Sequence, residues 1–294
     1  DTKMGAPGLR YPHAAIVGCA KTITFVMNDG YDPVSGMQLG IKTGDCTKFE
    51  TFEEFYDAWH KQFRAGFDFA TTLEHKNRHV EANHFPKPMA SAIYERCIEA
   101  GENIAKPLER SSPWFTLFAF GEEGDCLAAV KKLVFDDKKY TMAELKKALE
   151  ANWEGYEDMR QDFLHAPKWG NDDDYVDQIY VRGYEDLGKI SRSKLDSCGQ
   201  PWPVLPETVG FHTVQAPKIG ALPNGRRWGD PLYDGGCSPG HGFDKKGPTA
   251  VLKSVSKIDH VSTVRATLLN QRLSPSQLQG EKGFAMWRDY MKTW

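Results

Sequence analysis

The sequence predicts an α/β fold in which helices dominate. Apolar residues recur at helical spacing in several long segments, whereas only residues 114–120 and 209–215 carry strand patterns. The two strand candidates lie far apart along the chain, as expected for strands that long helical connections join. No internal repeat, low-complexity tract or linker divides the 294 residues, so we expect residues 1–294 to form a single domain segment.

The first helix is predicted over residues 12–29. Apolar residues recur there at helical spacing, and Gly30 supplies the left-handed conformation that ends many helices. Residues 30–50 are rich in Gly and Asp and predict a loop. Thr51 and Glu54 then form a capping box, in which each side chain binds the backbone N–H of the other residue, so a long helix is expected to begin there.

The middle of the chain carries a strand signal followed by helix signals. The apolar run WFTLFAF, residues 114–120, predicts a buried strand, and Asp125 is expected to cap a helix that runs to Phe135. Thr141 and Glu144 form a second capping box, which predicts the start of the next helix.

The last third of the chain combines a strand candidate with a long loop. A helix should follow Asn171, which is expected to cap it, and VGFHTVQ, residues 209–215, alternates as a strand does. Residues 216–249 are dense in Gly and Pro and predict an ordered loop. Pro248 suits the first turn of a following helix, and Ser274-Pro275 opens a further short one.

The composition excludes several classes of protein. Thirty-seven basic residues against 40 acidic ones give no basic field for a nucleic acid, and no apolar run approaches the roughly 20 residues that a membrane helix needs. The N-terminal residues show no signal peptide. The six cysteines are spread out without a CxxC pair, which disfavours a zinc ribbon or an iron–sulfur cluster and favours free thiols in a reducing cytoplasm.

Three consecutive acids, Asp172 to Asp174, allow two interpretations. They suit the first turn of a helix, where carboxylates meet unpaired N–H groups and the positive end of the helix dipole. They also suggest a divalent metal site, but adjacent helical residues point in different directions and the alternating ligands of a calcium loop are absent. The helix start is favoured, and no metal is expected.

Two further segments carry candidate site residues. His75 and His79 lie four apart on one helix face, as zinc ligands can, yet His84 precedes a proline-broken loop and HExxH is absent. A solvated helix end is therefore favoured. Residues 220–250 are rich in glycine but lack both the Walker pattern and a strand that leads into GxGxxG, so they predict a long ordered loop.

Four strings that occur in order carry a resemblance to a known family: APKWGNDDDYVD, GALPNGRRWGDPLYDGG, SPGHGFDKKGPTAVLKSVSKIDH and TLLNQRLSP. Together they resemble the glycyl radical enzymes, the pyruvate formate-lyase superfamily, and the resemblance covers most of residues 20–294. TGDCTKFETFEEFYDAW is also similar to a segment of that family. The chain resembles the decarboxylase, dehydratase and fumarate-adding branches more than pyruvate formate-lyase itself.

The resemblance implies part of a ten-stranded barrel, built from two antiparallel five-stranded halves and surrounded by helices. One loop inside the barrel carries a cysteine that becomes a thiyl radical, and a second loop carries a glycine that stores the radical. The resemblance implies no bound cofactor, because an iron–sulfur activase that uses S-adenosylmethionine installs the glycyl radical after translation. A closed barrel keeps such a radical from water and oxygen.

The resemblance places both reaction centres outside residues 1–294. The family's cysteine loop falls before residue 1, and the RVxGY motif of the C-terminal glycyl radical domain falls after Trp294. Cys19 offers a Gly-Cys pair, but it lies within the predicted first helix, so a packed thiol is favoured over the thiyl residue. VRGYED imitates part of the glycine motif, and its Gly183 is expected to be an ordinary helix glycine. The segment alone is therefore expected to be inactive.

Five residues are candidates for contact with a substrate. Arg10 follows the expected cysteine loop and can bind a carboxylate with two hydrogen bonds, although a surface arginine is an equal alternative. Trp114 and Phe115 begin a predicted strand and can wall an aromatic substrate, with core packing as the alternative. His212 and Gln215, on the second predicted strand, can orient substrate or bind backbone groups of the barrel.

These features favour a radical lyase of anaerobic metabolism that cleaves a C–C bond and is similar to an arylacetate decarboxylase. The enzymatic alternatives are a fumarate-adding synthase and a radical dehydratase. The non-enzymatic alternative is an inactive fragment or structural homologue. The resemblance implies a small organic acid as substrate, a transient activating enzyme and a homodimer, with or without a small accessory subunit.

Overall fold

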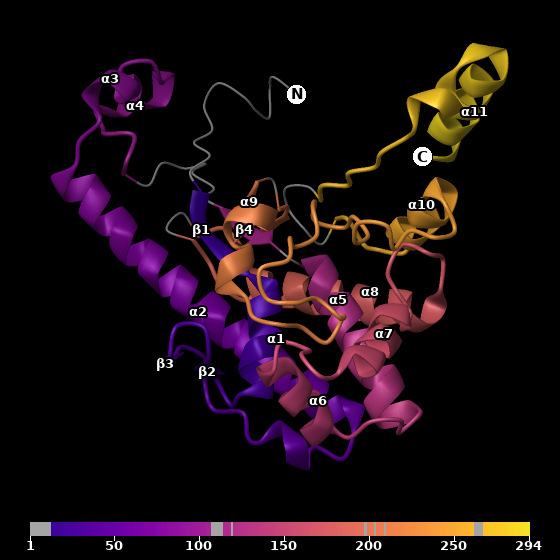
Figure 1. The fold of residues 1–294 in the computed structure, drawn as a ribbon. Helices are drawn as coiled ribbons and strands as arrows, with labels where there is room; N and C mark the ends of the chain where they lie inside the picture. The colour runs from indigo at the N-terminus through magenta and orange to yellow at the C-terminus, as the bar shows by residue number, and fades with distance from the viewer. Residues whose placement is uncertain are drawn as a thin grey trace.

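A parallel sheet of three strands lies at the centre of the fold (Figure 1). The computed structural model describes residues 13–106, 114–118, 120–196, 199–202, 204–208, 210–261 and 267–294, with the backbone alone for 13–17 and 114–118. The middle strand, β4 (Trp114–Phe118), pairs with β1 (His13–Gly18) on one side and with β5 (Val204–Pro206) on the other. A separate antiparallel pair joins β2 (Tyr31–Asp32) to β3 (Met37–Gln38).

Helices form most of the remaining structure. The longest, α2 (Phe52–His84), extends beyond the body of the molecule and carries α3 and α4 at its far end (Figure 1). In chain order the other helices are α1 (Cys19–Met27), α3 (Pro88–Ser91), α4 (Glu95–Ala100), α5 (Phe120–Val130), α6 (Met142–Glu150), α7 (Glu157–His165), α8 (Asp174–Arg192), α9 (Phe211–Val214), α10 (Pro248–Ser256) and α11 (Gly280–Thr293). Short 3₁₀ turns occur at Cys46–Lys48, Ala216–Lys218 and Pro275–Leu278, and α5 continues as a π-helical turn over Lys131–Asp136.

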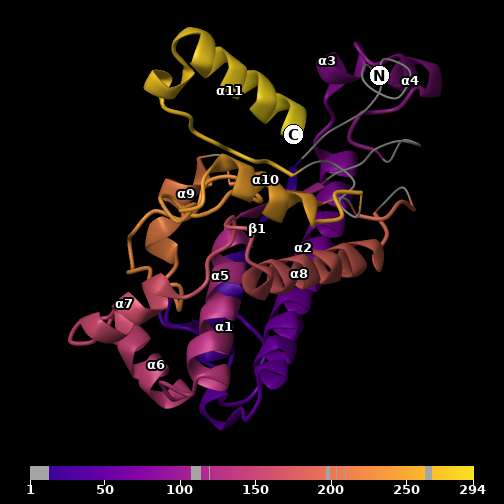
Figure 2. The same ribbon diagram turned by 90° about the vertical axis from the view of Figure 1, so that its right-hand side faces the viewer.

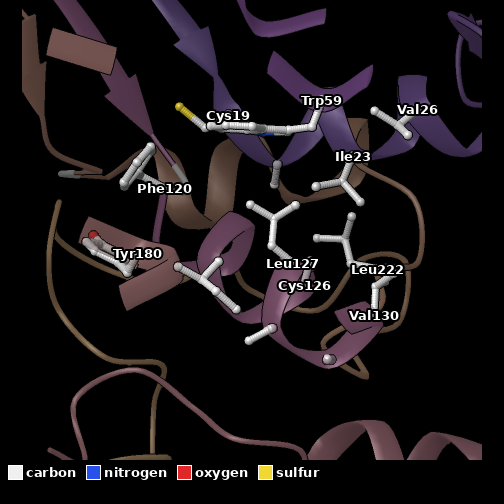
Figure 3. Close-up of a cluster of buried hydrophobic side chains, with 14 of the residues drawn as sticks. Cys19, Ile23, Val26, Trp59, Phe120, Cys126, Leu127, Val130, Tyr180 and Leu222 are labelled. Atoms are coloured by element: carbon white, nitrogen blue, oxygen red, sulfur yellow. The ribbon is translucent and has the colours of Figure 1, made fainter. Parts of the chain in front are cut away.

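The core lies where α1, α2, α5 and α8 meet (Figure 2). Trp59 from α2, Phe120 from α5 and Tyr180 from α8 are buried together with Cys19 and other apolar side chains (Figure 3). Trp169 stacks on Tyr180 with ring centroids 3.9 Å apart. Burial of such large rings contributes about 1.5–3 kcal/mol each, so this cluster holds the helices against one another.

Several local predictions are confirmed. Capping boxes begin α2 at Thr51 and α6 at Thr141, with the partner glutamates in place. β4 starts at Trp114 as expected. Residues 216–249 form mostly irregular structure, and Pro248 opens α10. Among the described residues, no helix is both long and apolar enough to span a membrane.

The predicted first helix is wrong in its first half. Residues 13–18 form β1, which pairs with β4, and the helix begins only at Cys19. A short apolar run suits a buried strand as well as a buried helix, so the periodicity did not distinguish the two. Cys19 therefore lies at the junction of a strand and a helix instead of inside a helix.

The strand predicted over residues 209–215 is also wrong. Gly210 adopts a left-handed conformation with φ 75°, and α9 follows directly, so His212 lies on a helix and Gln215 ends it. Alternation over these seven residues favours a half-buried strand, but the left-handed Gly210 turns the chain directly into α9. The ten-stranded barrel is likewise not visible in the described residues, whose main sheet has the three parallel strands β1, β4 and β5.

Two residues that were predicted to cap helices, Asp125 and Asn171, do not do so. Asp125 lies inside α5, which already begins at Phe120. Asp173, not Asn171, caps α8, and its side chain accepts a hydrogen bond from the Tyr175 N–H. The Asn171 amide instead binds backbone groups of the distant loop at Phe243 and Lys246, a tertiary contact that local sequence does not reveal.

Candidate functional site

A polar cavity of about 420 Å³, which we call the His212 hollow, lies beside α9. Three segments form it: α9, the loop around residues 234–244, and the irregular segment around residue 270. Its lining residues are His212, Asp234, Ser238, Pro239, Gly240, His241, Gly242, Asp244, Asn270, Gln271 and Arg272. Two imidazoles, two carboxylates, a guanidinium and two amides thus line one cavity, which offers several polar groups to a ligand.

Hydrogen bonds of the backbone connect the three segments. The N–H of Leu268 donates to the Pro206 carbonyl at the end of β5, and the Leu268 carbonyl accepts from the Gly236 N–H at 2.8 Å. The Asn270 N–H donates to Ser238 Oγ at 2.7 Å. A Cβ at Gly236 would lie 1.8 Å from the Pro206 carbonyl oxygen, so only glycine fits there. These bonds position the hollow at the carboxyl end of the sheet.

His212 and Asp234 form the most specific pair in the hollow. His212 Nδ1 is buried 3.9 Å from Asp234 Oδ1 and has no hydrogen-bond partner among the described residues. Asn270 Nδ2 donates to the other carboxylate oxygen at 2.8 Å, which orients Asp234. The His241 ring lies edge-on to His212 with centroids 6.4 Å apart. The Asp234 carboxylate lies on the Nδ1 side of the His212 ring but beyond hydrogen-bond distance, so it acts on the imidazole through its charge and leaves Nε2 for a ligand.

Buried carboxylates on α5 lie behind the hollow. Burial raises the pKa of Glu122 to about 8, that of Glu123 to about 7 and that of Asp125 to about 6. Tyr233, the neighbour of Asp234, connects them to the hollow, because its N–H donates to Glu122 and its hydroxyl donates to Asp125 at 2.8 Å. Trp59 Nε1 donates to Glu123. One oxygen of each glutamate, Oε2, lacks a hydrogen-bond partner among the described residues.

Sequence reasoning missed this carboxylate group. The available signal was GEEGD directly after an apolar strand, since acids within an apolar run are commonly buried and functional or paired. Asp125 was instead predicted to cap a helix that runs to Phe135. Sequence reasoning also missed Asp234, His241 and Arg272, because they are spread over a glycine-rich loop and a later segment.

The structure separates the predicted site residues. Of these, His212 lines the hollow, whereas Gln215 ends α9 and does not line it. Trp114 and Phe115 lie in β4, and the description covers only their backbone. Arg10 lies outside the described residues. Their roles in binding substrate therefore stay predictions.

Cys19 and Gly183 occupy packed positions. Cys19 is fully buried, and burial, followed by the charge of Glu123, holds the pKa of its thiol well above the usual value. Such a thiol favours its protonated form. Gly183 lies within α8, where a Cβ would contact Phe120 and Trp59 at 3.6 Å. This agrees with an ordinary helix glycine.

Two acids of the triplet, Asp172 and Asp174, pair with lysines. Lys257 Nζ lies 3.1 Å from Asp172, 2.7 Å from Asp174 and 2.7 Å from Asp177, and Lys253 adds a second cation. Within the described part of the chain, no group of three His, Cys, Asp or Glu side chains is placed to hold a metal ion. The His75 ring contacts Trp202 with centroids 5.5 Å apart and the rings tilted by 36°.

Comparisons with known proteins agree on one family. Residues 2–202 match the family described as pyruvate formate lyase-like, and residues 233–294 match the family described as glycine radical. The second match indicates a glycyl radical that is installed after translation. The position of the radical glycine itself, expected beyond Trp294, stays a prediction.

Three relatives illustrate the range of activities. The chain is 39% identical to trans-4-hydroxy-L-proline dehydratase of Clostridioides difficile over 90% of its length. It is 36% identical to isethionate sulfite-lyase of Oleidesulfovibrio alaskensis over 87% of its length. It is 30% identical to indoleacetate decarboxylase of Tractidigestivibacter scatoligenes over 99% of its length. The chain covers 33%, 31% and 36% of these relatives, so it spans about a third of each.

The fold agrees with these matches. The crystal structure of the C. difficile hydroxyproline dehydratase superposes with a TM-score of 0.83 at 36% identity, over 94% of this chain and 35% of the dehydratase chain. The described residues therefore have the fold of one part of such an enzyme. The remainder of that larger fold accounts for the strands of the predicted barrel that are not visible here.

Proposed function

Because the chain belongs to the pyruvate formate lyase-like family of glycyl radical enzymes, we propose that the protein is a radical lyase that eliminates a leaving group from a small anionic substrate. The observation that carries this proposal is the pairing of His212 with Asp234 in a hollow that also holds His241 and Arg272. The dehydratase and the sulfite-lyase among the relatives support elimination more than decarboxylation, since their percentage identity to this chain is higher, 39% and 36% against 30% for the decarboxylase.

Elimination requires a proton donor near the leaving group. The cysteine thiyl radical formed from the stored glycyl radical would abstract a hydrogen atom from the substrate, and loss of a hydroxyl group from the adjacent carbon would then need a proton. A histidine with a carboxylate behind Nδ1 can deliver that proton from Nε2, which commonly accelerates a reaction by about 10²–10⁴-fold. We therefore assign the role of general acid to His212 and that of orienting group to Asp234.

The same hollow offers recognition of an anion. Arg272 lies on the segment that also carries Asn270, across the hollow from α9. A guanidinium binds a carboxylate or sulfonate through two parallel hydrogen bonds, and the rigid fork fixes the orientation of the substrate. An anionic group at Arg272 would thereby present the neighbouring hydroxyl or other leaving group to His212.

Product analysis tests this function. The full-length protein is activated anaerobically and incubated with hydroxyproline, isethionate and indoleacetate, and water loss, sulfite and carbon dioxide are measured. Elimination from one of the first two substrates is expected, with kcat lowered by roughly 10²-fold or more in His212→Asn. Carbon dioxide release from indoleacetate, unaffected by His212→Asn, would contradict both the reaction and the assigned residue.

An arylacetate decarboxylase is the second candidate. Indoleacetate decarboxylase is similar to 99% of this chain, and the aromatic pair Trp114-Phe115 remains a predicted wall for an aromatic substrate. A fumarate-adding synthase would instead consume fumarate. An activated sample that shows no glycyl radical doublet in electron paramagnetic resonance would support the non-enzymatic alternative.

The partners remain part of the proposal. Installation of a glycyl radical requires an activating enzyme, for which an iron–sulfur protein that uses S-adenosylmethionine is proposed. A homodimer in the cytoplasm, with or without an accessory subunit, is proposed on the same family grounds. Co-purification with and without the activating enzyme, followed by measurement of molecular mass in solution, tests these assignments.

A further inference from the structure

A second cavity, which we call the α1–α6 cavity, has a volume of about 170 Å³ and shares no lining residue with the His212 hollow. It lies between the C-terminal half of α1, the end of α6 and the loop over residues 220–228. Its lining residues are Ile23, Thr24, Met27, Asn28, Pro33, Val34, Lys146, Leu149, Glu150, Asn152, Gly220, Ala221, Leu222, Pro223 and Trp228. The proposed reaction uses none of them.

Most of the cavity wall is apolar and belongs to the core. Ile23 and Leu222 are fully buried, and Figure 3 shows both on the same side of the core cluster. Met27 and Pro223 extend this wall. The cavity opens to the surface, so a small apolar ligand can enter it and remove this wall from water.

The mouth of the cavity is polar but carries balanced charge. Lys146 and Glu150 lie one turn apart on α6 and contribute opposite charges. The Trp228 indole is half exposed at the mouth, and its Nε1 donates to the Pro217 carbonyl at 2.7 Å. The Trp228 N–H donates to Asn152 Oδ1 at 2.7 Å, which ties the loop to the chain beyond α6. These two hydrogen bonds hold the Trp228 ring at the mouth of the α1–α6 cavity.

We propose that the α1–α6 cavity binds a small uncharged ring compound of the size of benzene or phenol. An apolar protein cavity of about 150 Å³ is sufficient for benzene, and this cavity is of that size. A charged ligand would lose its hydration without gaining a dedicated partner, because the opposite charges of Lys146 and Glu150 offset one another. An aromatic ligand would also gain contact with the Trp228 ring.

A ligand in the α1–α6 cavity would restrict the motion of the loop that leads to the His212 hollow. Arg226, whose guanidinium is buried, donates to the carbonyls of Ala216, Ile219 and Gly220. Ala216 directly follows Gln215, which ends α9. A ligand that contacts Gly220 and Leu222 would therefore restrict the segment that supports His212.

Ligand-induced stabilisation tests the proposal. Urea unfolding of the purified protein is followed with benzene, phenol or sodium benzoate, because a ligand that binds only the folded state raises the unfolding midpoint as its concentration rises. Benzene and phenol are expected to raise the midpoint, and benzoate is not. Ala221→Leu and Leu149→Trp fill the cavity from two different walls and are expected to abolish the rise.

The matched control is Ile98→Trp, which adds the same indole at an exposed position on α4. This variant should keep the full response to benzene. A response that survives in a folded cavity-filling variant, a wild-type protein without any response, or an equal response to benzoate would overturn the proposal.

Discussion

Lys257, the residue that directly follows α10, binds the fully buried carboxylate of Asp177 on α8, with Nζ 2.7 Å from Oδ2. Ser254 Oγ donates to the same oxygen at 2.9 Å. Burial nevertheless raises the pKa of Asp177 above its ordinary value. The contact therefore compensates for a charge that the fold has removed from water, and it joins two helices far apart in sequence.

Lys257→Met should cost about 3–5 kcal/mol of unfolding free energy, because it leaves the Asp177 carboxylate buried without its cation. The matched control is Lys253→Met within α10. Lys253 is 62% exposed and pairs with Asp172 at 3.2 Å, so its loss should cost less than about 1 kcal/mol. Urea unfolding measures both values, and equal costs would contradict the assignment.

Stability should fall as pH rises from about 5 to 8. Burial raises the pKa of Glu122 to about 8 and that of Glu123 to about 7, above the unfolded value of about 4.3. The folded state therefore holds protons that the unfolded state releases. The resulting stabilisation is complete at pH values below the unfolded pKa, and it is lost as the pH rises through the folded pKa. The slope is up to about 1.4 kcal/mol per pH unit for each carboxyl.

The control for this pH dependence is the double variant Glu122→Gln, Glu123→Gln, which has no proton to release. Its unfolding free energy should vary less between pH 5 and 8 than that of the wild type. A wild-type stability that increases over this window would show that both carboxylates are ionised in the folded protein.

Gly236→Ala should destabilise the protein by about 3 kcal/mol or more and disrupt the His212 hollow. The added Cβ would lie 1.8 Å from the Pro206 carbonyl oxygen, so β5 or the loop must move. Gly66→Ala is the control, since its Cβ meets no atom within 4 Å and it lies within α2. That change should stabilise by about 0.5–1 kcal/mol. Thermal unfolding distinguishes the two outcomes.

Arg272→Met should raise KM for an anionic substrate roughly 10–100-fold, which corresponds to the loss of a charge-assisted hydrogen bond of about 1.5–3 kcal/mol. Neutral diols, if turned over, should be unaffected. Arg227→Met is the control, because Arg227 pairs with Glu157 on the surface, outside the hollow. Equal effects of both variants on KM would remove Arg272 from substrate recognition.

Local signals predicted the parts of the fold that depend on neighbouring residues. The capping boxes at Thr51 and Thr141 were found because each is made by side chains three residues apart. Residues 13–18 were misassigned because their strand exists only through pairing with β4, about 100 residues later. His212 was identified as a candidate from its chemistry, but its predicted strand was wrong and its partners were not found.

By itself, the sequence determined the family, the starts of α2 and α6 and the irregular character of residues 216–249. These follow from ordered strings and from contacts within a few residues. Only the tertiary structure decided that Asp234, His241 and Arg272 surround His212, and that the acids after Asn171 pair with Lys253 and Lys257. Such groups meet through hydrogen bonds between distant backbone segments, and no local pattern in the chain encodes that proximity.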